Sequence, residues 1–269
     1  MTRLLILALL AFSHSTFGKE IPPFLSDWVP TTKQLTEEEW YAANNDGTTW
    51  DVYLEGEHVK VKPFDFAKQE EPISLKLQDG TLISDEQGEF GAAVFWESKK
   101  GRTKLSEDHI RQFIQLGTRV FAISGLAHLG TDYGDFLELK RKGNGWRISR
   151  IAKLKDEPQK AVRESQTSLL VLTYSSLTRV SLDGSTKLIV QKGDWDGLIP
   201  RTLVMDGKGF AYVGFSQRVA KVELSTGKVV YLVPYAEIFE NDLKRHKEKR
   251  LERILDSTQP PYRPTDDSK

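Results

Sequence analysis

The last two-fifths of the folded chain repeat one pattern of apolar runs and polar turns. Residues 169–190 contain three strand-like runs, separated by a short polar link and by a turn at 183–185. Residues 211–233 repeat this order 42 positions later, so that Val171 matches Val213. A repeat of about 40–45 residues with several strands in each unit is typical of the blades of a β-propeller.

A third copy of the repeat lies upstream. Its strands are predicted at 120–123, 136–140 and 146–151, and an insertion at 125–135 separates the first two of them. Between the two clear copies, residues 200–215 give a proline-led strand, an Asp-x-x-Gly turn and a strand that contains Tyr-Val. This segment resembles the blade unit of NHL-, YVTN- and quinoprotein-like propellers. The resemblance implies an architecture and no particular activity.

Alternation also predicts strands before the repeat, at 50–54, 58–62, 73–77, 81–84 and 90–96. Strand-bearing sequence therefore runs from residue 50 to residue 234, and at about 42 residues per blade it holds four or five units. We predict an all-β fold, a β-propeller of about five blades. A β-sandwich or an irregular domain of two sheets is the alternative.

Two segments depart from the strand period. In residues 105–116, Ser106 is a candidate N-cap for a short helix with Ile110, Phe113 and Ile114 on one face. In residues 235–256, apolar residues recur every three or four positions, which predicts an amphipathic C-terminal helix. The basic polar face of this helix is either simply solvated or a contact for an acidic partner.

The N-terminal residues indicate export. Arg3, the apolar run 4–12 and small polar residues give residues 1–18 the order of a secretory signal peptide. The run is too short to cross roughly 30 Å of hydrocarbon, so we expect a periplasmic or secreted protein with no transmembrane segment in its mature form. Residues 19–49 are predicted to be an extended N-terminal segment with at most a helical turn after Thr36, and residues 257–269 to be disordered.

Composition excludes several classes of function. The 38 Lys and Arg residues balance 38 Asp and Glu residues, so no net field attracts nucleic acid. The chain contains no Cys, which excludes disulfides, thiolate chemistry and a lipoprotein anchor. No histidine motif has the spacing of a zinc site, and no nucleophile elbow or phosphate-binding loop is present. We therefore expect a monomer without cofactor or metal.

The insertion at 125–135 is the first candidate binding site, because extra residues at one place in a repeat are often found on the binding face. It carries His128, Asp132, Tyr133 and Asp135. The aspartates are candidates for a carboxylate pair or, with His128, for ligands of a hard cation. The alternative is that they only form turns beside glycine.

The loop between the two clear copies is the second candidate. There, Asp194 and Asp196 flank Trp195, an arrangement that suits stacking on a sugar ring if the indole is exposed. The same residues match a fragment of a calcium loop, but the distal glutamate is missing. The alternative is that Trp195 covers the edge of the core while the aspartates cap turns.

These observations favour a binding module over an enzyme. Loops from every blade of a propeller converge on one face, so the two candidate segments are expected to meet there and to recognise a protein or a glycan. An inhibitor or immunity-type protein is one form of this function. The alternative is a hydrolase or lyase acting on a glycan or lactone, which needs two carboxylates about 5–9.5 Å apart around one bond. No residue is assigned as catalytic.

Overall fold

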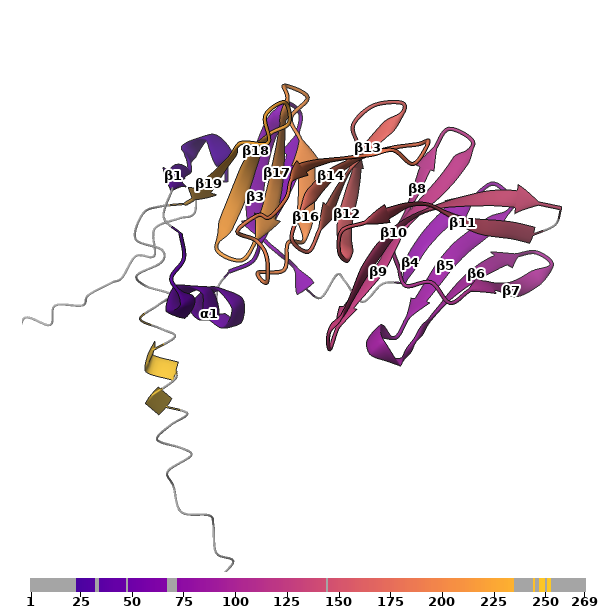
Figure 1. The fold of residues 1–269 in the computed structure, drawn as a ribbon, viewed down its shortest axis with the longest axis horizontal. Helices are drawn as coiled ribbons and strands as arrows, with labels where there is room; N and C mark the ends of the chain where they lie inside the picture. The colour runs from indigo at the N-terminus through magenta and orange to yellow at the C-terminus, as the bar shows by residue number, and fades with distance from the viewer. Residues whose placement is uncertain are drawn as a thin grey trace, which may run out of the picture.

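The computed structural model describes residues 23–31, 34–46, 48–66, 72–143 and 145–234, together with 244, 247–249 and 251–252. Within these residues the chain forms four antiparallel sheets that each contain four consecutive strands, and one two-stranded hairpin. Figure 1 shows the sheets side by side in a curved row, with β6 and β7 at one end and β1 and β19 at the other.

Each four-stranded sheet is a simple meander in chain order. The first contains β4 (Ile73–Leu77), β5 (Gly80–Glu86), β6 (Ala92–Ser98) and β7 (Gly101–Ser106). The second contains β8 (Ile110–Leu116), β9 (Arg119–His128), β10 (Thr131–Lys142) and β11 (Gly145–Leu154). The third contains β12 (Pro158–Arg163), β13 (Ser168–Thr173), β14 (Leu177–Ser181) and β15 (Thr186–Val190). The fourth contains β16 (Thr202–Met205), β17 (Phe210–Phe215), β18 (Arg218–Glu223) and β19 (Val229–Val233).

Apolar clusters lie between successive sheets and hold the row together. Trp96 belongs to the cluster between the first and second sheets, Phe121 to the next, and Leu172 to the one between the third and fourth. The hairpin of β2 (Trp50–Glu55) and β3 (His58–Pro63) then covers the fourth sheet through the fully buried Trp50. Burial on both faces explains why the strand Ser168–Thr173 is buried at every position and contains the unbroken apolar run 169–172 instead of an alternation.

The first strands of neighbouring sheets touch one another. Strand β4 contacts β8, β8 contacts β12, β12 contacts β16, and β16 contacts β2. Four-stranded meanders that pack face to face around their first strands are propeller blades, so the predicted propeller architecture is confirmed. The count of five blades stays a prediction, because the described residues hold four such sheets and a hairpin.

The helix predicted within 105–116 is wrong, because this segment contains β8. A β-bulge shifts the register of β8 between Ile110 and Gln112, and Arg111 is the extra residue. The bulge leaves Ile110 and Phe113 buried on the same side of the sheet, in the cluster next to the first sheet. Their spacing of three residues therefore imitates a helical period.

The described part of residues 19–49 contains more regular structure than the predicted extended segment. Strand β1 (Val29–Thr31) pairs with β19 as a fifth strand, after the short 3-10 helix η1 (Leu25–Asp27). Helix α1 (Glu37–Asp46) begins with a capping box. The Glu39 N–H donates to Thr36 Oγ1 at 3.3 Å, and the Thr36 N–H donates to the Glu39 carboxylate at 3.0 Å.

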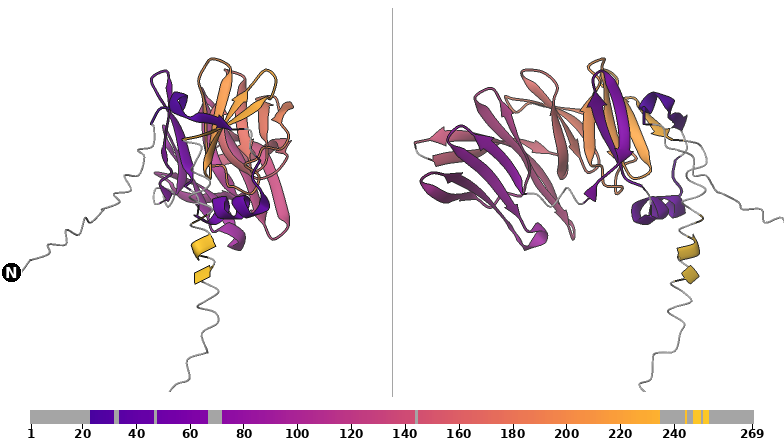
Figure 2. Two further views of the ribbon diagram at one scale, coloured as in Figure 1. Left: turned by 90° about the vertical axis from the view of Figure 1, so that its left-hand side faces the viewer. Right: turned by 180° about the vertical axis from the view of Figure 1, so that it is seen from behind.

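Several predictions lie wholly or largely outside the described residues. The signal peptide 1–18 and the tail 257–269 are among them, and so is most of 235–256. The described residues of that last stretch are helical, and Lys247 forms an ion pair with Glu38 of α1 at 3.5 Å. Figure 2 shows this helical piece below α1. Among the described helices, none is both apolar enough and long enough to cross a membrane.

Candidate functional site

The start of the first strand in each sheet lies at the same end as the hairpin between its second and third strands. In the second sheet Ile110 lies opposite Ser124, and in the third sheet Pro158 lies opposite Thr173. We call this end the loop face and the other end the turn face. The loop face comprises the connections 107–109, 155–157 and 191–201 and the hairpin turns 87–91, 129–130, 174–176 and 216–217.

The insertion at 125–135 is not a loop, as the sequence had suggested, but a continuation of β9 and β10. The strands stay paired up to His128 and Thr131, and Leu129 and Gly130 form the tip with φ angles of 43° and 87°. The extra residues therefore lengthen one hairpin of the loop face, and His128 lies exposed beside the tip.

Asp132 and Asp135 point to opposite faces of β10, because residues three apart on a regular strand do so. The Asp132 carboxylate accepts the backbone N–H of Glu157 at 2.9 Å, whereas Asp135 forms an ion pair with Arg150 at 3.3 Å. The predicted carboxylate pair is therefore wrong for these two residues. Burial raises the pKa of the half-buried Tyr133 phenol, and the charge of Asp108 adds to this effect.

The two candidate segments come near enough for the charges of Asp132 and Asp196 to interact. Burial raises the pKa of the Asp132 carboxyl, although the hydrogen bond from Glu157 acts to lower it. The negative charges of Asp156 and Asp196 raise this pKa further. Asp196 forms an ion pair with Lys192 at 3.3 Å, and its side chain is 38% exposed. Carboxylates from distant parts of the chain thus share one region of the loop face.

Trp195 is fully buried, so the expected exposed stacking surface is absent at this residue. Its ring packs against Phe215 with 6.4 Å between centroids, within the cluster between the third and fourth sheets. The backbone N–H of Asp194 donates to the Tyr231 hydroxyl at 2.9 Å, and burial raises the pKa of Tyr231 to about 12. Trp195 therefore belongs to the packing beneath the loop face, and the backbone of the half-buried Asp194 is anchored to it through Tyr231.

A polar hollow lies where the first strands converge. Its volume is about 1020 Å³, and its walls come from all five sheets. Ten of the residues around it carry polar side chains: Asp51, Ser84, Asp85, Glu86, Arg102, Arg111, Gln159, Lys160, Arg201 and Thr202. Phe64, Pro72, Ile73 and Ile83 supply the apolar part of the wall.

Two bulges at equivalent places aim side chains into this hollow. Arg111 is the extra residue of β8, and Gln159 is the extra residue of β12, where the register shifts between Pro158 and Lys160. Bulges commonly redirect side chains beside functional sites. The neighbouring Gln112 fixes the two first strands together, because its side-chain amide exchanges hydrogen bonds of 3.0 and 3.1 Å with the backbone of Ala161.

Two contacts fix the position of the Arg111 side chain. Its guanidinium forms an ion pair with Glu157, and its Nε donates to the Gly125 carbonyl at 3.2 Å. Burial raises the pKa of Glu157, against the attraction of the Arg111 charge. On the other wall, His109 Nδ1 lies 2.8 Å from the Glu86 carboxylate.

Arg201 differs from Arg111, because it forms no ion pair with any residue that the structure describes. Its backbone N–H donates to Gly214 at 3.0 Å, which fixes it just before β16, and its buried Nε has no hydrogen-bond partner among the described residues. Burial lowers the pKa of its guanidinium, which the charge of Glu157 only partly offsets.

The sequence did contain a signal for these basic residues. Arg111, Lys160 and Arg201 each lie at or just before the start of a first strand, in three successive sheets. Single-sequence reasoning does not find it, because the spacing in 105–116 imitates a helix and the strand 158–163 has no regular apolar alternation.

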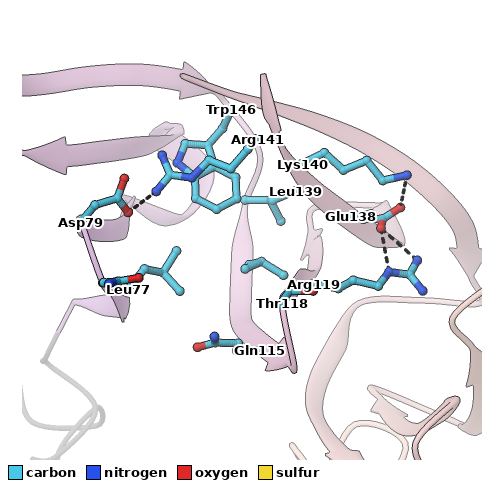
Figure 3. Close-up of a pocket in the computed structure, with 12 residues that line it drawn as sticks. Leu77, Asp79, Gln115, Thr118, Arg119, Glu138, Leu139, Lys140, Arg141 and Trp146 are labelled. Atoms are coloured by element: carbon cyan, nitrogen blue, oxygen red, sulfur yellow. Dashed lines mark hydrogen bonds and ion pairs between the residues drawn. The ribbon is translucent and has the colours of Figure 1, made fainter. Parts of the chain in front are cut away.

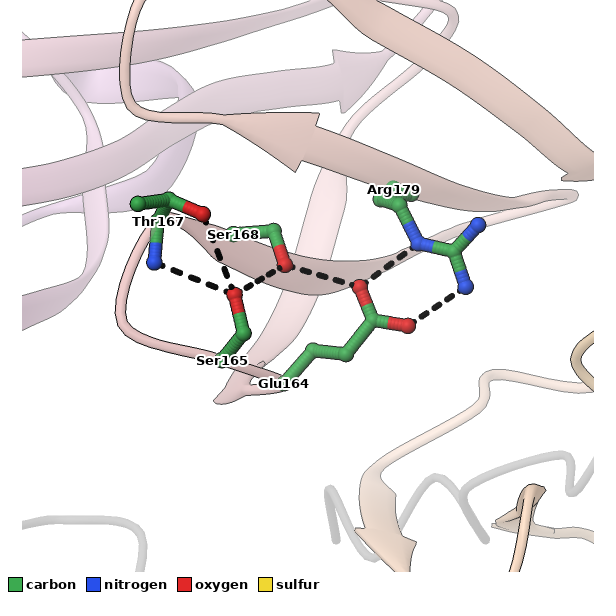
Figure 4. Close-up of polar contacts among 5 residues, drawn as sticks. All are labelled: Glu164, Ser165, Thr167, Ser168 and Arg179. Atoms are coloured by element: carbon green, nitrogen blue, oxygen red, sulfur yellow. Dashed lines mark hydrogen bonds and ion pairs between the residues drawn. The ribbon is translucent and has the colours of Figure 1, made fainter.

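The turn face contains a second hollow, of about 560 Å³, in which the charges are already paired. Figure 3 shows Arg141 against Asp79 and beside the Trp146 ring, and Glu138 between Arg119 and Lys140. Figure 4 shows a similar closed network, in which Glu164 accepts from Arg179 and Ser168. These contacts hold sheets and turns together and leave little charge for a ligand.

The positions of the described side chains do not indicate a metal site. Among them, no three His, Asp or Glu side chains are grouped closely enough to hold a metal ion.

Comparisons with known proteins give distant structural likenesses. No protein family and no curated protein matches the sequence. A virginiamycin B lyase from Staphylococcus aureus has a TM-score of 0.41 at 8% identity, over 71% of each chain. A streptogramin B lyase has a TM-score of 0.40 at 12% identity, over 78% of this chain and 74% of the other. A protein of unknown function from Bacteroides caccae has a TM-score of 0.37 at 12% identity, over 70% of each chain. At these values the likenesses carry no conclusion about activity, and the blade architecture rests on the strand pairing of this chain.

Proposed function

We propose that this chain is an exported propeller-type binding module that recognises a protein or a glycan through its loop face and the hollow beside it. The observation that carries the proposal is the hollow of about 1020 Å³, whose polar side chains come from every sheet. A concave site with convergent polar groups is the usual form of a ligand site in a rigid fold.

The two bulges support the proposal. A bulge interrupts a strand ladder, and here Arg111 and Gln159 turn toward the same hollow from adjacent sheets. Because both lie on strands rather than on long loops, the site is largely formed before a ligand arrives, which reduces the entropy lost on binding. Export is supported by the charged, apolar and polar order of residues 1–18. An inhibitor or immunity-type protein is one role that such a module fills.

The experiment compares ligand capture by two variants of the mature chain. Immobilised wild type is exposed to a glycan array and to periplasmic extract, alongside Gln159→Ala in the hollow and Arg147→Gln on the outer strand β11. We expect Gln159→Ala to lose the captured ligand and Arg147→Gln to retain it. Equal capture by both variants, or no specific capture by the wild type, contradicts the proposal.

A hydrolase or lyase is the second candidate, and one observation favours it. Asp132 and Glu157 are neighbouring residues of the loop face whose carboxyl pKa values are both raised by burial, and a carboxyl with a raised pKa is suited to act as a general acid. Incubating glycans and lactones with wild type and with Glu157→Gln tests this. New reducing ends, unsaturated products or ring-opened lactones with wild type alone support an enzyme.

A further inference from the structure

We infer that the ligand of the hollow is an acidic oligosaccharide, whose carboxylate binds Arg201 while its hydroxyls bind the polar walls. This inference deepens the proposed function and rests on it. It starts from the balance of charges around the hollow.

Three of the four basic residues around the hollow form no ion pair with a described residue, whereas two of its three acidic residues have a basic neighbour. Asp51 forms an ion pair with Lys62 at 3.4 Å, and Glu86 Oε1 lies 2.8 Å from His109 Nδ1, while Glu86 Oε2 has no hydrogen-bond partner among the described residues. By contrast, Arg102, Lys160 and Arg201 form no ion pair within the part of the chain that the structure describes. Asp85 is the one acidic residue around the hollow for which the structure gives no ion pair with a described residue. A ligand with negative charge is therefore favoured there.

Among these three cations, Arg201 is the best candidate for a direct contact with the ligand. It is half-buried, its Nε is unpaired among the described residues, and its guanidinium lies 5.9 Å from the centre of the Phe66 ring. Keeping such a charge away from water costs free energy unless an anion accompanies it. Because Nε itself is buried, the carboxylate is placed on the two terminal nitrogens of the guanidinium, from which it accepts two parallel hydrogen bonds.

Lys160 and Arg111 lie on the two adjacent first strands and extend the positive wall. Arg111 already holds Glu157, so its position is fixed and its remaining charge is partly offset. Lys160 follows the bulge residue Gln159 on β12. The anion is thus placed toward β12 and β16, away from Asp85 on β5.

The rest of the wall suits sugar hydroxyls better than an acidic peptide. Gln159 and Thr202 supply neutral hydrogen-bonding groups, and the aspartates accept from hydroxyls. A hydroxyl both donates and accepts, so a wall of mixed character satisfies several hydroxyls on one ligand. The volume of about 1020 Å³ lies at the upper end of ordinary ligand sites and holds more than one sugar unit.

The test measures binding of defined ligands by titration calorimetry at low salt. The acidic panel is tetragalacturonate, a hyaluronan tetrasaccharide and a muramic-acid-containing cell-wall fragment. The matched controls are fully methyl-esterified tetragalacturonate, maltotetraose and tetraglutamate. We expect at least one acidic oligosaccharide to bind, with at least tenfold weaker binding for its neutral counterpart.

Variants locate the contact. We expect Arg201→Met to weaken binding of the acidic oligosaccharide at least tenfold and Lys160→Met to weaken it at least fivefold. Arg147→Gln is expected to leave binding unchanged. Thermal melting checks that each variant is folded. Lys160→Met keeps the test decisive if Arg201→Met fails to fold.

The failures are distinguishable. Equal binding of neutral and acidic sugars overturns this inference and leaves the binding module intact. Binding of tetraglutamate alone also overturns it, in favour of an acidic peptide. If no oligosaccharide of the panel binds, the inference fails, and if the capture experiment also finds no ligand, the proposed function fails with it.

Discussion

At the scale of single residues, the structure separates side chains that hold the fold from those that face a ligand. Trp195 stood out in the sequence as a stacking surface, yet it is fully buried beneath the loop face. Arg111 and Arg201 did not stand out, yet both line the hollow. A sequence shows which residues carry chemistry, but burial and pairing decide whether that chemistry is available to a ligand.

Glu164 makes the stability of the fold depend on acid pH. The hydrogen bonds from Arg179, which Figure 4 shows, hold the pKa of this carboxyl below its usual 4.5. A carboxyl with a lower pKa in the folded state stabilises the fold above its unfolded pKa, and this contribution is lost as the pH falls through the folded value. We expect Glu164→Gln to lower the free energy of unfolding at pH 7 by about 1–3 kcal/mol.

The check is urea unfolding of wild type and Glu164→Gln between pH 7 and pH 3. The difference in unfolding free energy is expected to be constant above the usual carboxyl pKa and to shrink below it. Asp183→Asn, at another turn of the same face, is the control and is expected to cost less, because Asp183 bonds only Ser185 within its own turn. A pH-independent difference for Glu164→Gln contradicts the account.

Trp195→Ala tests whether this residue is core or ligand surface. Because the indole is fully buried, we expect the free energy of unfolding to fall by about 3–5 kcal/mol. Tyr41→Ala removes a side chain that is 49% exposed on α1 and is expected to cost less than about 1 kcal/mol. Urea unfolding measures both. A small loss of stability together with a large loss of ligand binding in Trp195→Ala contradicts the burial described above.

At the scale of elements, alternation predicted most strands and failed where a bulge interrupts it. The strands at 73–77 and 81–84 and the hairpin from residue 50 are confirmed, because their apolar residues fall on one face at a regular spacing. In 105–116 the bulge at Arg111 creates a spacing of three, which single-sequence reasoning reads as helical. The extension at 125–135 was missed for another reason: a long, exposed hairpin has little apolar alternation to reveal it.

Helix α1 depends on its capping box. Thr36→Ala removes the acceptor for the Glu39 N–H, and we expect it to lower stability by about 1 kcal/mol. Hydrogen exchange of the amides in the first turn of α1 is expected to quicken in this variant. Thr36→Ser keeps the hydroxyl and is expected to retain protection, so equal exchange in both variants contradicts the capping role.

At the scale of the whole molecule, the sheets form a row whose first strands meet at one axis, and this arrangement creates the hollow. The repeat predicted the blades, and the convergence of loops predicted that distant segments share one face. The hollow itself was beyond single-sequence reasoning, because its walls combine residues as distant as Asp51 and Arg201. Only the packing of successive sheets, through clusters such as the one around Trp96, brings them together.

The central claim is that ligand binds in this hollow, at the starts of the first strands. Hydrogen–deuterium exchange of the mature chain, free and saturated with the ligand obtained in the capture or titration experiments, tests it most directly. We expect protection to concentrate at 109–112, 157–161 and 200–203. Protection confined to the turn face, at 117–118, 164–167 and 183–185, would contradict the account.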